Sequence, residues 1–164
     1  MILAVPGSVR SGGTNVRLLH ALAKLAHPRR VVVGELIEFL PLFTPEAKIT
    51  DEVVDWRQMV HQAEAVIFCT PEYLHNLPAA LKSALEWLTT GGELADKPVV
   101  ALTATPHSPR GERAMQSLLW SLEALNARVV AQMPVYDVPS KVNDAGDITD
   151  EALRELLMLL LEQI

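Results

Sequence analysis

The feature that most constrains the fold is a fivefold alternation of short apolar runs with stretches of helical period. Between the runs, apolar residues recur every three or four positions, as Leu18, Leu22 and Leu25 do. That spacing places them on one face of a helix. Alternation of this kind predicts an α/β sandwich around a parallel sheet. The predicted strands are Ile2–Val5, Val31–Ile37, Ala65–Thr70, Val99–Ala104 and Arg128–Met133.

The helical stretches follow each strand in turn. The first is predicted over Val16–Ala26 and the last over Asp150–Ile164, where Thr149 is a suitable N-cap. The other three carry their apolar stripes near residues 53–60, 77–88 and 114–125. Two segments without such periodicity, Glu38–Thr50 and Val135–Ile148, are predicted to be loops.

Length and charge narrow the class of protein. A chain of 164 residues fits one domain, here residues 1–164, and 49% apolar with 21% charged residues is an ordinary globular composition. The formal charge of −6 argues against general nucleic-acid binding, because a phosphate backbone would be repelled. A small anionic ligand in a local basic niche is compatible with it.

The cysteine count and the hydropathy pattern indicate the cellular compartment in which the protein is expected to work. Cys69 is the single cysteine, so an internal disulfide and a cysteine zinc cluster are excluded, and we expect a packed thiol. The first residues have neither the basic flank nor the apolar length of a signal peptide. Apolar runs are far shorter than the ~20 residues of a membrane helix. We therefore expect a cytoplasmic protein without a membrane contact.

Open parallel sheets bind ligands beyond the carboxyl ends of their strands, where the strand order reverses. Three loops leave strands at that edge, with the sequences GSVRSGGTN, PEYLHNLP and TPHSPRGER. These three loops are the candidate site.

The first loop, Gly7–Asn15, joins a strand to a helix and brings free backbone N–H groups to the positive end of a helix dipole. It lacks the lysine of a nucleotide-triphosphate loop and the glycine spacing of a dinucleotide loop. Its arginine and hydroxyls suit a single terminal phosphate. The alternative is a tight turn with Thr14 or Asn15 capping the helix. The candidate phosphate ligands are Ser8, Arg10, Ser11, Thr14 and Asn15.

The second loop, in the segment TPEYLHNLPAALKSALEWL, offers the aromatic face of Tyr73 for stacking on a flat ring. Its neighbours offer backbone groups and an imidazole for the polar edge of that ring. A flat heteroaromatic with a phosphate tail, such as flavin mononucleotide (FMN), would span the first two loops.

Both loops resemble the NADPH-dependent FMN reductase family. GSVRSGGTN is similar to its GS-x-R-x-x-S-x-N phosphate loop, and PEYLHNLPAALKSALEWL to its PEYNHS-I-PG-x-LKNALDW segment. The resemblance implies a flavodoxin-like three-layer sandwich with strand order 2-1-3-4-5. It also implies FMN as cofactor, NADPH or NADH as co-substrate, a quinone, azo dye or similar small acceptor, and a homodimer or homotetramer.

The resemblance carries over to single positions. Ser8, Arg10 and Asn15 would surround the FMN phosphate, and a second set would line the isoalloxazine and ribityl chain. Leu74 stands where the family has asparagine and Asn76 where it has serine, which changes the contacts to the polar edge of the ring. The second set is Pro71, Glu72, Tyr73, Leu74, His75 and Asn76, with Thr105 and His107 from the third loop.

The third loop departs most from the family, which has a glycine-rich stretch here. Pro106 and Pro109 stiffen the backbone and remove two N–H donors, while His107 and Arg110 supply charge instead. The alternative is a rigid, solvated loop without a role in chemistry.

Three functions fit these observations. The first is an FMN-dependent NAD(P)H oxidoreductase, in which the cofactor carries the chemistry and no side chain is nominated for proton transfer. The second is an FMN-binding electron carrier that uses no nicotinamide. The third is a non-catalytic module of the same fold that acts through a partner. No metal site is expected.

Overall fold

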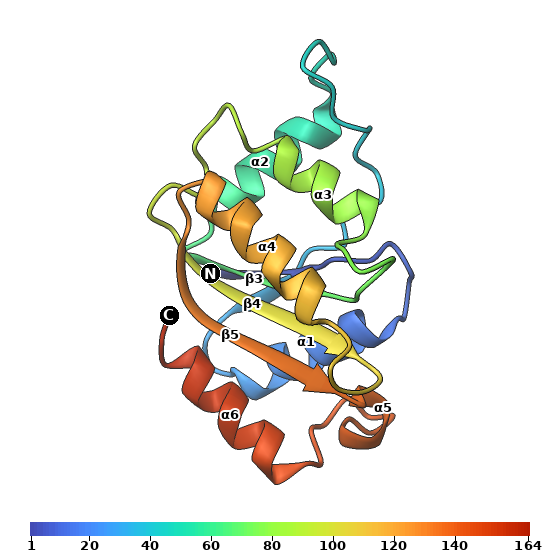
Figure 1. Cartoon of the computed structure of the whole chain (residues 1–164). Coiled ribbons are helices and arrows are strands. Elements are labelled where there is room, and N and C mark those ends of the chain that lie inside the picture. Colours follow the sequence, from blue (N-terminus) through green and yellow to red (C-terminus); the bar gives the residue numbers. More distant parts are fainter.

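The computed structural model describes residues 1–164 and contains one five-stranded sheet in the order β2-β1-β3-β4-β5, all neighbours parallel (Figure 1). This confirms the predicted α/β sandwich and the strand order implied by the family resemblance. The strands are β1 (Ile2–Pro6), β2 (Val31–Val33), β3 (Ala65–Thr70), β4 (Pro98–Thr105) and β5 (Arg128–Tyr136).

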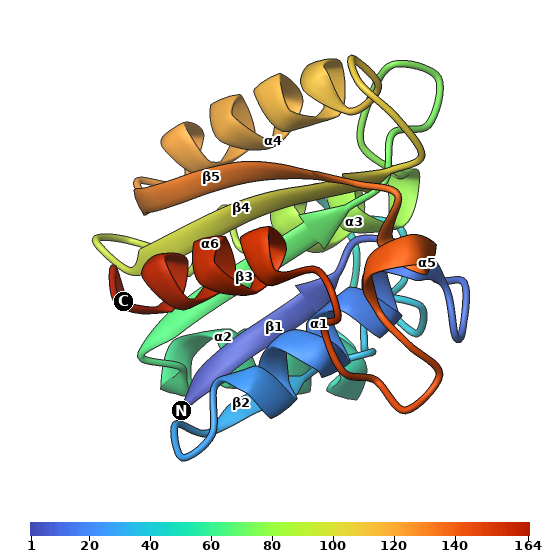
Figure 2. The same cartoon turned by 90° about the horizontal axis from the view of Figure 1, so that it is seen from below.

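Helices cover both faces of the sheet and make the three layers (Figure 2). One face carries α1 (Thr14–Leu25), α5 (Val138–Lys141) and α6 (Glu151–Leu161). The opposite face carries α2 (Asp51–Gln62), α3 (Ala79–Glu86) and α4 (Glu112–Ala124).

The two cores follow from the alternation of side chains along the central strands. Leu3 and Phe68 pack under α2, α3 and α4, whereas Ile2 and Ile67 pack under α1 and α6. Every residue of β3 is buried, as the continuous apolar run Ala65–Thr70 predicts for a strand covered on both faces.

Three local predictions were wrong. The second strand ends at Val33 instead of Ile37, and Ile37 packs into the core under α2, α3 and α4 and not into the sheet. The segment Val135–Ile148 is not all loop, since β5 runs on to Tyr136 and α5 follows. The N-cap of α6 is Asp150, whose carboxylate accepts from the N–H of Leu153, and not Thr149.

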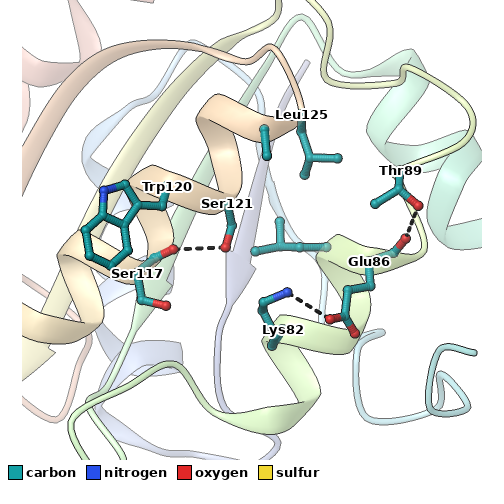
Figure 3. A pocket seen from close by; sticks show the side chains of 9 residues that line it. Lys82, Glu86, Thr89, Ser117, Trp120, Ser121 and Leu125 are labelled. Atoms are coloured by element: carbon teal, nitrogen blue, oxygen red, sulfur yellow. Dashed lines mark hydrogen bonds and ion pairs between the residues drawn. The ribbon is translucent and has the colours of Figure 1, made fainter.

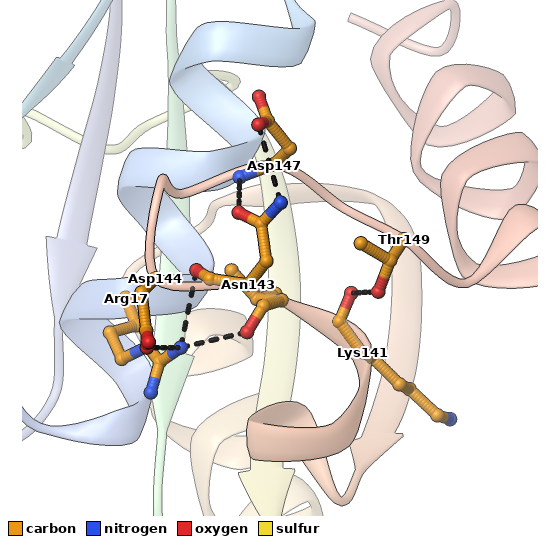
Figure 4. Close-up of polar contacts among 7 residues, drawn as sticks. Arg17, Lys141, Asn143, Asp144, Asp147 and Thr149 are labelled. Atoms are coloured by element: carbon orange, nitrogen blue, oxygen red, sulfur yellow. Dashed lines mark hydrogen bonds and ion pairs between the residues drawn. The ribbon is translucent and has the colours of Figure 1, made fainter.

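Two basic side chains of α1, Arg17 and Lys24, hold the connection between α5 and α6, and Figure 4 shows the contacts of Arg17. Arg17 of α1 donates to the carbonyl oxygens of Val142 (2.7 Å) and Asn143 (3.3 Å) and lies 3.7 Å from Asp144. Lys24 contacts the carbonyl oxygen of Ala145 and the carboxylate of Asp147, so this segment docks on α1 through a guanidinium and an ammonium group.

Substituting Arg17→Met is expected to lower the free energy of unfolding by about 1–2 kcal/mol, because the variant keeps the stem and loses charged hydrogen bonds. Chemical denaturation followed by circular dichroism measures this. Arg154→Met is the matched control, since Arg154 only pairs with Glu151 on the exposed surface of its own helix. Equal losses in both variants would contradict a docking role for Arg17.

The strand order reverses between β1 and β3. Consecutive connections run outward from this point, to β2 on one side and to β4 on the other. The loops that follow β1 and β3 therefore diverge and leave room for a ligand between them. None of the helices is both long enough and apolar enough to cross a membrane.

Candidate functional site

Three loops gather at the carboxyl edge of the sheet, where β1, β3 and β4 end (Figure 2). Together they line a cavity of about 210 Å³, which we call the inner cavity. The loops predicted from the sequence are thus brought together. The inner cavity is lined by Ser8, Arg10, Gly13, Thr14, Asn15, Pro71, Glu72, Tyr73, Ala104, Thr105, Pro106 and Arg110.

The first loop begins with a glycine because the backbone passes too close to β3 for any side chain. The N–H of Gly7 donates to the carbonyl oxygen of Cys69 at 2.7 Å. A Cβ atom at Gly7 would lie 2.9 Å from the Cβ of Thr70 and 2.8 Å from Leu81. This contact fixes the first loop against the root of the second.

Asn15 is oriented inward from the start of α1. It is only 5% exposed, and its Oδ1 accepts a hydrogen bond of 3.3 Å from the thiol of Cys69. Burial raises the pKa of the Cys69 thiol, so the group stays protonated and packed at neutral pH. The prediction of a packed thiol is confirmed.

Ser8 links the first loop to the second. Its hydroxyl accepts from the N–H of Arg10 at 3.3 Å and lies 3.3 Å from the phenol oxygen of Tyr73. The guanidinium of Arg10 lines the inner cavity and forms no ion pair with a carboxylate of the chain. A free cation therefore stands beside the N-terminus of α1.

The start of α1 carries no acidic group. Its N-cap is Gly13, with no side-chain hydrogen bond, and its first turn has no carboxylate. The alternative reading, in which Thr14 or Asn15 caps the helix, is not what the structure shows. The first turns of α2, α4 and α6 each hold an Asp or Glu. The dipole of α1 is left uncompensated at the inner cavity, where Arg10 also lies.

The second loop turns sharply over two residues. Tyr73 and Asn76 exchange backbone hydrogen bonds of 2.9 Å in both directions, and between them Leu74 and His75 have φ angles of 48° and 59°. Positive φ at both central residues is the pattern of a type I′ turn, which favours Asn and Gly. Leu74 is also 99% exposed. An apolar residue in a left-handed conformation thus projects from the rim of the site.

Replacing Leu74→Asn is expected to raise the free energy of unfolding by about 0.5–1 kcal/mol, because Asn adopts the left-handed region at lower cost. Thermal and urea denaturation measure the change. Leu42→Asn is the control, since Leu42 is 74% exposed but has no positive φ. Unchanged stability in Leu74→Asn would show that the turn is not strained.

Glu72 connects the second loop to the third. Its side chain is 7% exposed, and Oε2 accepts from the backbone N–H groups of Gly111 (3.0 Å), Arg113 (3.2 Å) and Ala114 (3.2 Å). Oε1 lies 3.4 Å from Nδ1 of His75. The carboxylate therefore caps the N-terminus of α4, although Glu72 lies 39 residues before Gly111 in the sequence.

These contacts shift the titration of Glu72. Burial disfavours the ionised form, but the backbone hydrogen bonds from Ala114, Gly111 and Arg113, together with His75, outweigh it and lower the pKa of Glu72 below its usual value. The carboxylate is thus ionised at neutral pH and holds the start of α4.

The third loop is closed at its own base. The hydroxyl of Thr105 donates to the carbonyl oxygen of Arg110 at 2.6 Å. Gly111 follows with φ of 106°, and a Cβ there would lie 3.0 Å from Thr103 and from Thr105. Glycine is needed because both the conformation and the close approach exclude a side chain. The loop Pro106–Arg110 is therefore held at both ends.

A second, larger cavity of about 530 Å³ lies between the second and third loops; we call it the outer cavity. It shares Glu72 and Arg110 with the inner cavity, so the two adjoin. Its lining is mostly polar and comes from Glu72, Leu74, His75, His107, Pro109, Arg110, Glu112 and Arg113.

Comparison with known proteins agrees with this arrangement. The model of the family described as NADPH-dependent FMN reductase matches residues 1–137. The chain belongs to this family. Its members are flavoprotein oxidoreductases that use FMN and NAD(P)H, and the resemblance drawn from the two loop motifs is confirmed.

Curated relatives of this FMN reductase family member include two bacterial enzymes. The NADH:(hydroxy)cinnamate reductase subunit CrdA of Vibrio ruber is 33% identical over 91% of this chain and 77% of that protein. A quinone reductase of Escherichia coli is 30% identical over 92% of this chain and 85% of the enzyme. Among solved structures, the NAD(P)H:acceptor flavoenzyme FerB of Paracoccus denitrificans has the same fold. It gives a TM-score of 0.80 at 23% identity, over 98% of this chain and 92% of that one.

The sequence-predicted site residues of the reductase divide between the two cavities. Leu74, His75 and His107 line the outer cavity, while Ser11 and Asn76 line neither. The side chain of Asn76 instead accepts from the N–H of Leu77 at 2.8 Å. The inner cavity receives Ser8, Arg10, Thr14, Asn15, Pro71, Glu72, Tyr73 and Thr105.

Sequence reasoning missed two features of the site. Arg113 lines the outer cavity but was not among the predicted residues. The cap that Glu72 forms on α4 had no sequence signal, because the carboxylate and the N–H groups are far apart in the chain.

A third hollow of the reductase, of about 330 Å³, lies between α3 and α4 and shares no residue with the inner or outer cavity (Figure 3). The indole of Trp120, 64% exposed, projects beside it, and Lys82 pairs with Glu86 across one turn of α3. Trp56 and Trp87, by contrast, are buried in the core. Trp120 is thus the one tryptophan of the chain that lies on the surface.

Proposed function

We propose that this member of the NADPH-dependent FMN reductase family transfers reducing equivalents from NADPH or NADH to a quinone, azo dye or similar small acceptor. The observation that carries the proposal is the inner cavity. It joins an unpaired Arg10 and an uncapped α1 with the loops that match the two motifs of the family.

The residues present fit FMN. The phosphate would be held by Ser8, Arg10, Thr14 and Asn15 of the inner cavity, with Ser11 of the same loop as a helper from outside its lining. A dianion is stabilised by a guanidinium, hydroxyls and free N–H groups at a helix start. The inner cavity, at about 210 Å³, is too small for a whole flavin nucleotide. The ring would therefore lie toward the outer cavity, along Pro71, Glu72, Tyr73, Leu74, His75 and Asn76, with Thr105 and His107 opposite.

When bound, FMN would supply the redox chemistry that links the nicotinamide donor to the acceptor. The chain positions the reactants. Tyr73 offers a ring face, and the Ser8 contact orients its phenol. The hydrogen bond from the N–H of Gly111 to Glu72 holds the second loop against the third at the site. No side chain is assigned a proton-transfer role.

The test is anaerobic stopped-flow of FMN-reconstituted protein mixed separately with NADPH and with NADH, monitored at the oxidised flavin band. Rapid bleaching followed by reoxidation on adding a quinone is the expected result. Bound flavin that stays yellow with both nucleotides would indicate the electron carrier. Failure to bind FMN would indicate the non-catalytic module. Either outcome would overturn the proposal.

We also propose a homodimer or homotetramer located in the cytoplasm. The hollow beside Trp120 supports a second copy as the occupant of the α3 and α4 face, and the buried thiol of Cys69 suits a reducing compartment. Light scattering after size exclusion would give the mass. Trp120→Glu is expected to lower it to that of one chain, and an unchanged mass would place the contact elsewhere.

A further inference from the structure

The outer cavity has a basic wall that the FMN contacts do not use. Arg110 lines both cavities, whereas Arg113 lines the outer cavity alone. Both side chains are exposed and stand at the end of the third loop and the start of α4. In a chain of net charge −6, this wall places two guanidinium groups next to the proposed flavin site.

Neither arginine is engaged by the chain itself. No carboxylate lies within ion-pair distance of Arg110 or Arg113, and neither guanidinium donates a hydrogen bond within the chain. Two acidic residues share the lining. Glu72 is committed to three N–H groups and His75, which leaves Glu112 as the one carboxylate free in the cavity.

The backbone that carries the arginines is fixed. The carbonyl of Arg110 is held by Thr105, and the N–H of Arg113 is held by Glu72. Pro106 and Pro109 stiffen the loop between these anchors. An anion entering the cavity would therefore meet two cations presented without large backbone rearrangement, which reduces the entropic cost of binding.

The N–H groups at the start of α4 take no part in this wall, because Glu72 already accepts from them. Any anion held here must be held by the side chains. Guanidinium groups bind phosphate with paired, charge-assisted hydrogen bonds, which a solvated surface lysine does not provide.

We infer that Arg110 and Arg113 form the site for a phosphate group of the nicotinamide nucleotide donor, on the wall of the outer cavity. This inference rests on the proposed function for the identity of the donor. It assigns a role to the proline-containing third loop, in which this chain departs from the glycine-rich stretch of the family. His75 and His107 line the same cavity.

The test uses FMN-loaded protein and two redox-inert probes, 2′,5′-ADP, which carries the 2′-phosphate, and ADP, which carries the pyrophosphate. Isothermal titration calorimetry of wild type, Arg113→Gln, Arg110→Gln and the control Arg128→Gln gives their affinities. Arg128 is an exposed arginine at the start of β5, at the opposite edge of the sheet. Loss of about 5- to 30-fold in affinity is expected for the Arg113 and Arg110 variants and none for Arg128→Gln.

Steady-state kinetics give the second readout. Arg113→Gln is expected to raise the KM of the nicotinamide donor by a similar factor, with kcat, the KM of a neutral quinone and the Kd of FMN unchanged. An effect confined to NADPH and 2′,5′-ADP assigns the site to the 2′-phosphate. An equal effect with NADH and ADP assigns it to the pyrophosphate. Both results support the inference.

Two results would overturn it. One is equal affinity of all four proteins for both probes. The other is a raised KM for a sulfonated quinone with an unchanged KM for the donor, which would assign the arginines to the acceptor. A protein that oxidises no NAD(P)H, yet binds the probes in a manner dependent on Arg113, would refute the proposed function and leave the phosphate site standing.

Discussion

Replacing Glu72→Ala is expected to lower the free energy of unfolding by about 3 kcal/mol, because three backbone N–H groups at the start of α4 lose their acceptor. The loss includes the cap of a 13-residue helix and the link between the second and third loops. Urea denaturation followed by tryptophan fluorescence measures it. The matched control is Glu112→Ala, since Glu112 is exposed on the same helix start and accepts none of these bonds.

The same contact predicts a pH dependence. A carboxyl whose pKa is lower in the folded than in the unfolded chain adds stability above its unfolded pKa, and that stability is lost as pH falls through the folded pKa. Wild type is therefore expected to lose stability below the ordinary Glu range, near pH 4, more steeply than Glu72→Gln. Parallel curves for the two proteins would show that Glu72 does not carry this effect.

The second large effect is expected at the cofactor. Arg10→Ala should weaken FMN binding by about 1.5–3 kcal/mol, or roughly 10- to 150-fold, because the side chain supplies a charged hydrogen bond to the phosphate. The side chain of Arg10 has no ion-pair partner within the chain, and Ala keeps the backbone hydrogen bonds of residue 10, so the variant is expected to stay folded. FMN titration of the apoprotein, followed by quenching of flavin fluorescence, gives the Kd.

Arg30→Ala is the control for the Arg10 variant, since Arg30 is exposed and precedes β2 at the far edge of the sheet. Riboflavin, which lacks the phosphate, provides a second comparison. Its affinity is expected to be the same in Arg10→Ala and wild type. Wild-type affinity of Arg10→Ala for FMN would refute the phosphate role of this residue.

Much of the architecture was predictable because hydrophobic pattern and topology act together. The run Ala65–Thr70 has too little polarity for a one-sided strand, and the structure buries it on both faces. The same reasoning placed three loops at one edge of the sheet, and they do converge on the inner cavity. The predicted strand Val31–Ile37 was too long. Apolar residues continue past Gly34 in the sequence, but Ile37, the last of them, packs into the hydrophobic core and not into the sheet.

The site was predictable in its positions and less so in its contacts. Glu72 stands in a motif that implies a flavin contact, and its carboxylate binds the start of α4, a contact that no local pattern encodes. The positive φ of Leu74 was not signalled by a leucine, since the turn more commonly contains Asn or Gly. Long-range hydrogen bonds and backbone conformations contrary to propensity are decided by tertiary structure.

The hydrogen bond between the Thr105 hydroxyl and the Arg110 carbonyl separates the residues of the third loop from the elements on either side of it. Its ends are fixed by Thr105, Gly111 and Glu72, none of which lies between Pro106 and Pro109. We therefore expect substitutions between Pro106 and Pro109 to leave the end of β4 and the start of α4 in place, because the anchoring hydrogen bonds lie outside that segment. In this fold, the residues between the anchors can therefore vary in sequence while the strand end at Thr105 and the helix start at Gly111 stay in place.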